Sequence, residues 1–104
     1  MNRCIFIHED ASLDLHEHFS YLAQTNRDRA VQFFDAARQT FATLGRIPGM
    51  GQQYDSEEDI VNIRKWVVKG LKKYLIFYRY DDEVLKILRI IHATRDLEPL
   101  LRDI

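Results

Sequence analysis

Cationic side chains gather in one part of this 104-residue chain. The stretch from Asn62 to Arg95 holds nine Lys or Arg residues against three acidic ones, whereas the whole chain has 15 basic and 16 acidic residues and a net charge of −1. A local excess of positive charge predicts a polyanionic partner, either nucleic acid or an acidic protein segment. The candidate binding residues in and just after this stretch are Arg64, Lys65, Trp66, Lys69, Lys72, Lys73, Arg79, Arg89, His92, Arg95 and Asp96.

Several of these candidates also have a purely structural interpretation. Lysines in a turn between strands are commonly solvated surface that protects a sheet edge. Trp66 stands between basic residues and suits either an amphipathic core position or an interface anchor. Arg95 and Asp96 can form a local ion pair at the start of a final helix, with Asp96 as its cap. The two interpretations are compatible, because one side chain can hold a structure and face a partner.

The spacing of the histidine, cysteine and acidic residues does not match a metal site, and we expect no cofactor. Strand alternation places His92 on the same side as Leu88 and Ile90, which favours a structural histidine on the core side over a catalytic base. The single cysteine, Cys4, lies in an apolar run and is predicted to be a buried, inert thiol. The acidic loop from Asp55 to Asp59 lacks the glycine and the ligand spacing of a calcium loop. No metal spacing with His92 is found for the remaining histidines, His8, His16 and His18.

Composition bounds the class of protein. Hydrophobic residues make up 46% of the chain and charged residues 30%, as in globular proteins, and residues 1–104 suffice for one domain with one modest core. The longest apolar run is far shorter than the ~20 residues of a membrane-spanning helix. The N-terminus also lacks the layout of a signal peptide. We therefore expect a soluble cytoplasmic protein without a membrane partner or a small-molecule ligand.

The first half of the chain predicts a strand followed by two helices. Residues 3–8 are β-branched and aromatic, which is typical of a short strand. From Glu9 to about Gln24, apolar residues recur at spacings of three and four, which indicates one face of an α-helix. A second helix is expected after Thr25 or Asn26, either of which can cap it, and should stop near Gly45. Because only a few residues connect the two helices, they are predicted to form an antiparallel hairpin. The apolar positions of this hairpin are Ala11, Leu15, Phe19, Leu22, Ala30, Phe33, Phe34, Ala37, Phe41 and Leu44.

The second half predicts a three-stranded meander. Residues 52–59 are polar and indicate an exposed loop, and strands are expected over residues 60–68, 74–80 and 84–92. Links of three to five residues permit only antiparallel neighbours. Leucines at helical spacing in the tail, residues 96–104, predict a short C-terminal helix. The fold class is therefore α+β: an antiparallel sheet, made of the N-terminal strand and the meander, packed against the helical hairpin.

These elements and motifs, taken together and in this order, resemble the RelE/ParE superfamily of toxins from type II toxin–antitoxin modules. The ParE branch is the most similar, over essentially the whole chain. The resemblance is carried by Asp14-Leu15, Tyr21-Leu22, Ala30 and Phe33 in the hairpin, by Pro48-Gly49-Met50-Gly51, and by Arg64-Lys65-Trp66, Tyr74-Leu75-Ile76-Phe77-Tyr78-Arg79 and Ile87-Leu88-Arg89-Ile90-Ile91-His92-Ala93-Thr94-Arg95-Asp96.

The resemblance implies a toxin that a cognate, ParD-like antitoxin neutralises by wrapping it, and a role in plasmid stabilisation. In the ParE branch the implied target is DNA gyrase, and in the RelE branch it is ribosome-bound mRNA, which the toxin cleaves. Arg95 occupies the place of a phosphate-stabilising arginine of the RelE-like nucleases, with Lys65 and Arg79 as further phosphate contacts. Those enzymes also use an aromatic hydroxyl a few residues later, where this chain has leucines and neither Tyr nor His.

That difference favours a toxin that acts by binding gyrase and has no catalytic residue of its own. A ribosome-dependent mRNA endonuclease is the alternative, and a degenerate homologue that binds its antitoxin and poisons nothing is a third interpretation.

Overall fold

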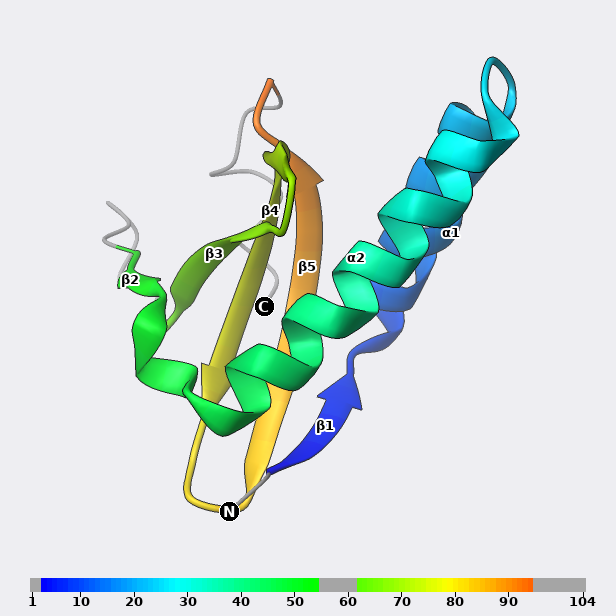
Figure 1. Ribbon diagram of the computed structural model, residues 1–104. Coiled ribbons are helices and arrows are strands. Elements are labelled where there is room, and N and C mark those ends of the chain that lie inside the picture. The colour runs from blue at the N-terminus through cyan, green and yellow to red at the C-terminus, as the bar shows by residue number, and fades with distance from the viewer. Residues whose placement is uncertain (1–2, 55–61, 95–104) are drawn as a thin grey trace.

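The computed structural model describes residues 3–54 and 62–94, in which two helices cover one face of a five-stranded sheet (Figure 1). The helices are α1 (Glu9–Ala23) and α2 (Arg27–Arg46), followed by a short 3-10 turn, η1 (Pro48–Met50). The strands lie in the order β1-β5-β4-β3-β2. Their bounds are β1 Cys4–Ile7, β2 Gln52–Gln53, β3 Arg64–Val68, β4 Leu71–Tyr80 and β5 Val84–His92.

The helical hairpin forms as its apolar spacing predicts. Ala11, Leu15 and Leu22 of α1 are buried, as are Phe33 and Phe41 of α2. The Asn26 side chain caps α2 by accepting a hydrogen bond from the Arg29 N–H at 3.1 Å. His8 caps α1 in the same way, because its Nδ1 accepts from the Asp10 N–H. Each cap satisfies a backbone donor that has no partner inside the helix.

The sheet confirms the predicted meander but corrects the prediction that every strand is antiparallel. β3, β4 and β5 are antiparallel neighbours, whereas β1 pairs with β5 in parallel, with Ile5 opposite Leu85. Within the meander, short links allow neighbouring strands to run only antiparallel. The helical hairpin and three other strands separate β1 from β5 in the sequence, so the length of the connection did not predict whether β1 runs parallel or antiparallel to β5. The sheet is therefore mixed.

Two local features also differ from the predictions. The predicted five-residue turn at residues 69–73 is shorter, because Gly70 adopts a φ of +78° and lets β4 begin at Leu71. Gln52 and Gln53, predicted to lie in a loop, form β2 and pair with β3. The acidic loop at residues 55–59 and the predicted C-terminal helix, with Arg95 and Asp96, lie outside the described residues.

A bulge in β5 changes which side chains share a face with His92. Phe77 pairs with Arg89 but Tyr78 pairs with Ile87, so Leu88 is an extra residue in β5. Ile90 therefore faces the helices, whereas Leu88 packs with a second cluster on the opposite face, which also contains Ile63, Phe77 and Ile91. His92 shares the helix-facing side with Ile90 and not with Leu88, because its ring stacks edge-on against the ring of Tyr74 in the helix-facing core.

Strand β1 is more exposed than its sequence suggests. All four of its residues are exposed, and the Cys4 thiol is exposed too, so the prediction of a buried cysteine is wrong. The physical reason is topological: β1 is an edge strand, and within residues 3–54 and 62–94 it pairs with β5 alone. An apolar run predicts a strand, but it does not reveal whether the strand is central or at an edge.

Candidate functional site

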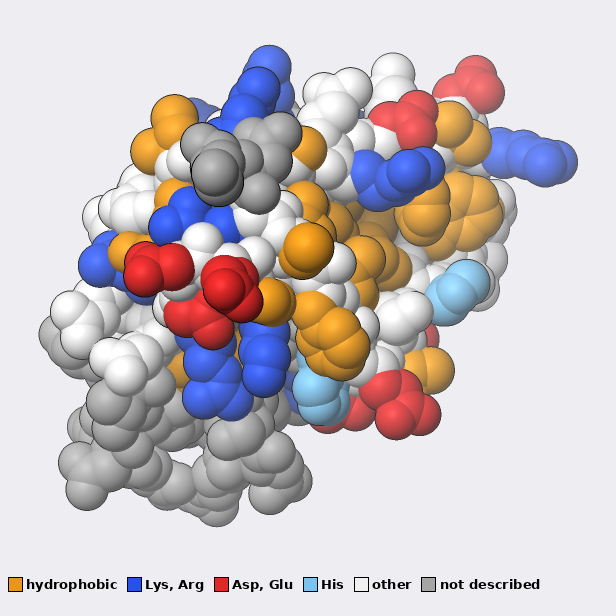
Figure 2. Space-filling view, turned by 90° about the horizontal axis from the view of Figure 1, so that it is seen from below, with side chains coloured by type: hydrophobic (Ala, Val, Ile, Leu, Met, Phe, Trp, Pro, Cys, Tyr) orange, Lys and Arg blue, Asp and Glu red, His pale blue; other side chains and the backbone are white. Residues whose placement is uncertain are grey.

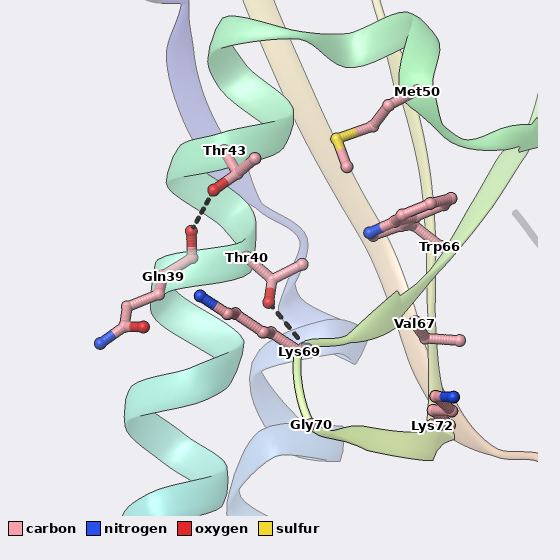
Figure 3. Close-up of a pocket in the computed structure, with 9 residues that line it drawn as sticks. All are labelled: Gln39, Thr40, Thr43, Met50, Trp66, Val67, Lys69, Gly70 and Lys72. Carbon is pink, nitrogen blue, oxygen red and sulfur yellow. Dashed lines mark hydrogen bonds between the residues drawn. The ribbon is translucent and has the colours of Figure 1, made fainter.

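An open groove of about 450 Å³ runs between helix α2 and strand β3 (Figure 3). Its apolar lining comes from Met50, Trp66 and Val67, whereas Lys69 lies in the β3–β4 turn and Lys72 at the start of β4. The wall on the side of α2 is polar and comes from Gln39, Thr40 and Thr43. Trp66 is half-buried and packs against the helix-facing core, so its ring is fixed in place. Of the residues predicted to bind, Trp66, Lys69 and Lys72 meet here.

One threonine sets the spacing of the two walls. The Thr40 hydroxyl accepts a hydrogen bond from the Lys69 backbone N–H at 3.1 Å and donates one to the Ala36 carbonyl at 2.7 Å. Thr40 is itself buried, with 5% of its surface exposed. These two bonds tie the β3–β4 turn to helix α2, so Lys69 is held at a fixed distance from the apolar lining.

A buried tyrosine positions the other end of the groove. The Tyr78 hydroxyl donates to the Pro48 carbonyl at 2.6 Å and accepts from the Gly51 N–H at 3.0 Å. Burial is the main reason why the pKa of Tyr78 is raised, so the hydroxyl keeps its proton and can donate. Arg64 adds a hydrogen bond to the Gly51 carbonyl at 2.7 Å. These contacts fix η1, which carries Met50 into the groove.

The remaining basic candidates are distributed over other surfaces. Lys65 and Arg79 lie on the helix-free face of the sheet, because they share it with Phe77, and the Lys65 ammonium stands 5.8 Å from the centre of the Tyr54 ring. Lys86 faces Arg79 directly across β4 and β5. The predicted cationic stretch therefore forms two separate basic surfaces, one at the groove and one on this helix-free face.

Arg89 lies on neither of these surfaces, because it is held by an ion pair. Its Nε and Nη2 donate to the two carboxylate oxygens of Asp14 at 2.8 and 2.9 Å. The Asp14 Oδ2 also accepts from the Ile90 N–H at 2.9 Å, and the His18 Nε2 lies 2.8 Å from the Ile90 carbonyl. Past the end of β1, these two side chains of α1 take the place of a neighbouring strand at the edge of β5. Nothing in the sequence signalled this role of Asp14.

His92 lies at the end of β5 among polar and aromatic neighbours. Its Nδ1 is 2.8 Å from the Thr94 hydroxyl, and its ring centre is 5.0 Å from that of Tyr74. Burial, followed by the charges of Lys73 and His18, lowers the pKa of His92. The imidazole is therefore neutral near pH 7, which suits a structural role at this position.

The described part of the chain shows neither a metal site nor a membrane-spanning helix. Within residues 3–54 and 62–94, no group of three or more His, Cys, Asp or Glu side chains is placed to hold a metal ion. No helix in these ranges is long and apolar enough to cross a membrane. The feature left to explain is the groove, whose apolar lining and paired lysines suit a protein segment better than a small ion.

The fold defines a small α+β protein with an open groove between α2 and β3. Comparison with known proteins gives the family. The family model described as the ParE toxin of the type II toxin-antitoxin system, parDE, matches residues 5–97, so this chain belongs to the ParE toxin family.

A solved structure shares the fold. A chain from the structure titled "Chromosomal ParDE TA system from P. aeruginosa" superposes with a TM-score of 0.72 at 15% sequence identity, covering 88% of this chain and 96% of that chain. No curated protein matches this sequence. The RelE/ParE resemblance is thereby confirmed, with ParE as the branch.

Proposed function

We propose that this toxin acts in the cytoplasm by binding and inhibiting DNA gyrase, and that a cognate antitoxin silences it by seating a segment in the α2–β3 groove. The observation that carries the proposal is the combination of an apolar lining at Met50 and Trp66 with lysines at Lys69 and Lys72. The family gives the class of activity, and the groove gives a place where control by a partner protein can act.

The chemistry of the groove defines the segment that would occupy it. An amphipathic helix can lay its apolar side chains on Trp66 and Met50 while acidic side chains reach Lys69 and Lys72. Opposite charges at the rim raise the association rate and set the orientation of the segment, and burial of apolar surface supplies most of the affinity. The expected occupant is therefore an acidic amphipathic segment of the antitoxin.

The positions of the titratable groups support binding over RNA cleavage. Cleavage at a phosphate needs a base and cations on the same surface. The cations Lys65 and Arg79 lie on the helix-free face, whereas the His92 ring packs on the helix-facing side against Tyr74. Arg89, a further predicted cation, is held by Asp14.

A supercoiling assay with purified gyrase and relaxed plasmid tests the proposed target. We expect the toxin to stop supercoiling or to leave cleaved DNA, and to lose this effect when its antitoxin is added first. Normal supercoiling at a tenfold excess of toxin would contradict gyrase as the target.

Primer extension on translating ribosomes tests the alternative target. Toxin-dependent cuts in the mRNA would support the RelE-like endonuclease in place of the gyrase inhibitor. Expression of the chain alone in a bacterium distinguishes both from a degenerate homologue, because only an active toxin stops growth.

A further inference from the structure

The outer edge of β1 presents backbone groups that the sheet does not pair. On its inner side β1 pairs with β5, where the Cys4 N–H donates to the Glu83 carbonyl and the His8 N–H donates to the Ile87 carbonyl, each at 2.9 Å. Because the groups of successive residues point to opposite sides of a strand, the N–H and C=O of Ile5 and Ile7 point outward. In the strand order β1-β5-β4-β3-β2, no strand from the described part of the chain lies on that side.

Helix α2 covers only the start of this edge, where the Arg3 N–H donates to the Gly45 carbonyl at 3.4 Å. Among the described residues, the rest of the edge lacks the protection that the other free edges of the sheet have. Asp14 and His18 cover β5 beyond the end of β1. The opposite edge strand, β2, is only two glutamines long. By contrast, the sequence of β1 is Cys-Ile-Phe-Ile, without a charge or a proline, and its pairing with β5 shows no register shift. Natural proteins normally blunt exposed strands with such features, so an unprotected edge indicates that another strand pairs there.

The side chains of β1 are apolar and exposed on both faces of the sheet. Ile5 is 40% exposed, Phe6 54% and Ile7 38%. Ile5 lies on the helix side, near Gly45, and Phe6 lies on the other face, opposite Lys86. Figure 2 shows hydrophobic side chains at the surface between acidic groups on either side. The strand that pairs here must be apolar on both of its faces.

We propose that β1 pairs with β1 of a second copy of this chain, in antiparallel register about a twofold axis at Phe6. Ile5 of each copy then lies opposite Ile7 of the other, and each such pair exchanges both of its backbone hydrogen bonds. The two Phe6 side chains meet directly at the axis. This register engages the outward groups of both Ile5 and Ile7 in each copy, whereas a shift of two residues would engage only one of these isoleucines in an isoleucine–isoleucine pair. It also keeps Phe6 of each copy on the same face of one continuous sheet.

Self-complementarity favours a second copy over an unrelated strand, because β1 itself directs Ile5 and Ile7 to one face of the sheet and Phe6 to the other. Continuing the register brings Arg3 of each copy level with the start of α1 in the other copy, while the Arg3 Nε donates to the Asp81 carbonyl of its own chain at 2.6 Å. The paired strands carry no charge of their own, and the net charge of −1 adds little repulsion between copies. A contact of four-residue strands buries less than about 1,200 Å² in total, so we expect a dissociation constant on the order of 0.1 mM.

Sedimentation equilibrium of the purified chain from 10 µM to 1 mM tests the dimer. We expect the weight-average mass to rise from that of the 12.4 kDa monomer to at least about 1.5 times that value at the highest concentration. Phe6→Lys places two ammonium groups at the axis and should keep the chain monomeric. Val31→Lys is the matched control, since Val31 is also apolar and 45% exposed but lies on α2, and it should dimerise as the wild type does.

Disulfide trapping tests the register without relying on a disruptive variant. Residues opposite each other in a non-hydrogen-bonded antiparallel pair have Cα atoms about 4.5 Å apart, which a disulfide can bridge. In a Cys4→Ser background, Phe6→Cys should form a covalent dimer on mild oxidation, whereas Val31→Cys should not. The wild-type Cys4 should not cross-link either, because the register places it opposite His8 of the other copy.

Three results would overturn the proposal: a monomer at 1 mM, a dimer that survives Phe6→Lys in a folded variant, or cross-linking at Cys4 as fast as at Phe6→Cys. Circular dichroism and the thermal midpoint establish that each variant is folded. The dimer concerns β1 and not the groove, so failure of the gyrase assay leaves it standing.

Discussion

Asp14 of helix α1 and Arg89 of strand β5, 75 positions apart in the sequence, share a two-pronged ion pair at 2.8 and 2.9 Å. The same carboxylate accepts the Ile90 N–H, so one side chain both neutralises the arginine and completes the edge of the sheet. The pair fixes helix α1 to β5 and therefore sets the position of the whole hairpin over the sheet.

Removing the carboxylate should cost more stability than removing the arginine. The side chains of Asp14 and Arg89 are only 9% and 19% exposed, so solvent replaces little of what is lost. We expect Asp14→Ala to lower the free energy of unfolding by about 2–4 kcal/mol and Arg89→Met by about 1–2 kcal/mol, because Asp14 also serves the Ile90 N–H. Urea unfolding measures both. Asp35→Ala, at an exposed position of α2, should stay within about 0.5 kcal/mol.

Two glycines of the turn after α2 should differ sharply in their tolerance of a side chain. A Cβ at Gly51 would clash with the Tyr78 hydroxyl and lie 2.8 Å from the Lys65 carbonyl, whereas a Cβ at Gly49 would meet only the Tyr80 hydroxyl at 3.7 Å. Gly51→Ala should lower the free energy of unfolding by about 1–3 kcal/mol, and Gly49→Ala should leave it nearly unchanged. Thermal unfolding of the two variants makes the comparison, and equal effects would contradict the tight packing at Gly51.

The Tyr78 hydroxyl should contribute to the free energy of unfolding, separately from the packing of its ring. Tyr78→Phe leaves the Pro48 carbonyl without its donor and the Gly51 N–H without its acceptor, both in the protein interior. We expect a loss of about 1–3 kcal/mol in the free energy of unfolding. Tyr80→Phe, at a 38% exposed position on the same strand, is the control. A Tyr78→Phe variant as stable as this control would show that the two bonds contribute nothing.

The titration of His92 should respond to one particular lysine. Burial, Lys73 and His18 lower its pKa below the ordinary 6.5, so the unfolded chain binds this proton more readily than the folded one. The contribution of His92 to stability is therefore present above pH 6.5 and is lost as the pH falls towards its lowered folded-state pKa. NMR titration should show the His92 midpoint move upward in Lys73→Ala and stay in place in Lys72→Ala. A midpoint above 6.5 in the wild type would contradict the assignment.

The groove can be monitored through the single tryptophan of the chain. If an acidic antitoxin segment covers Trp66, its fluorescence should shift to shorter wavelength on binding, because water is removed from the ring. Charge reversal of Lys69 and Lys72 to Glu should weaken the complex at least about tenfold at low salt. The control is Arg79→Glu on the helix-free face. If Arg79→Glu weakens binding as much as the double variant does, the groove is not the antitoxin site.

Local pattern was enough to predict most of the elements. The three-to-four spacing of apolar residues predicted both helices, and the bounds of β5 were predicted correctly as Val84–His92. Thr25 and Asn26 were equally good predicted caps for the second helix, and Asn26 is the one that caps it. These features depend on neighbours within a few positions, where propensity and capping act directly. Trp66, Lys69 and Lys72 were likewise recognisable as binding candidates from charge and residue type.

What the sequence alone determined is therefore most of the elements, the meander and the family; the tertiary structure decided what depends on non-local pairing, including strand β2. The parallel direction of β1, the exposure of Cys4, the bulge that separates His92 from Leu88, and the Asp14–Arg89 pair all join segments far apart in the chain. A local pattern carries no information about which distant backbone groups will meet. Only the packed hairpin and sheet divide the cationic stretch between a groove and an open face.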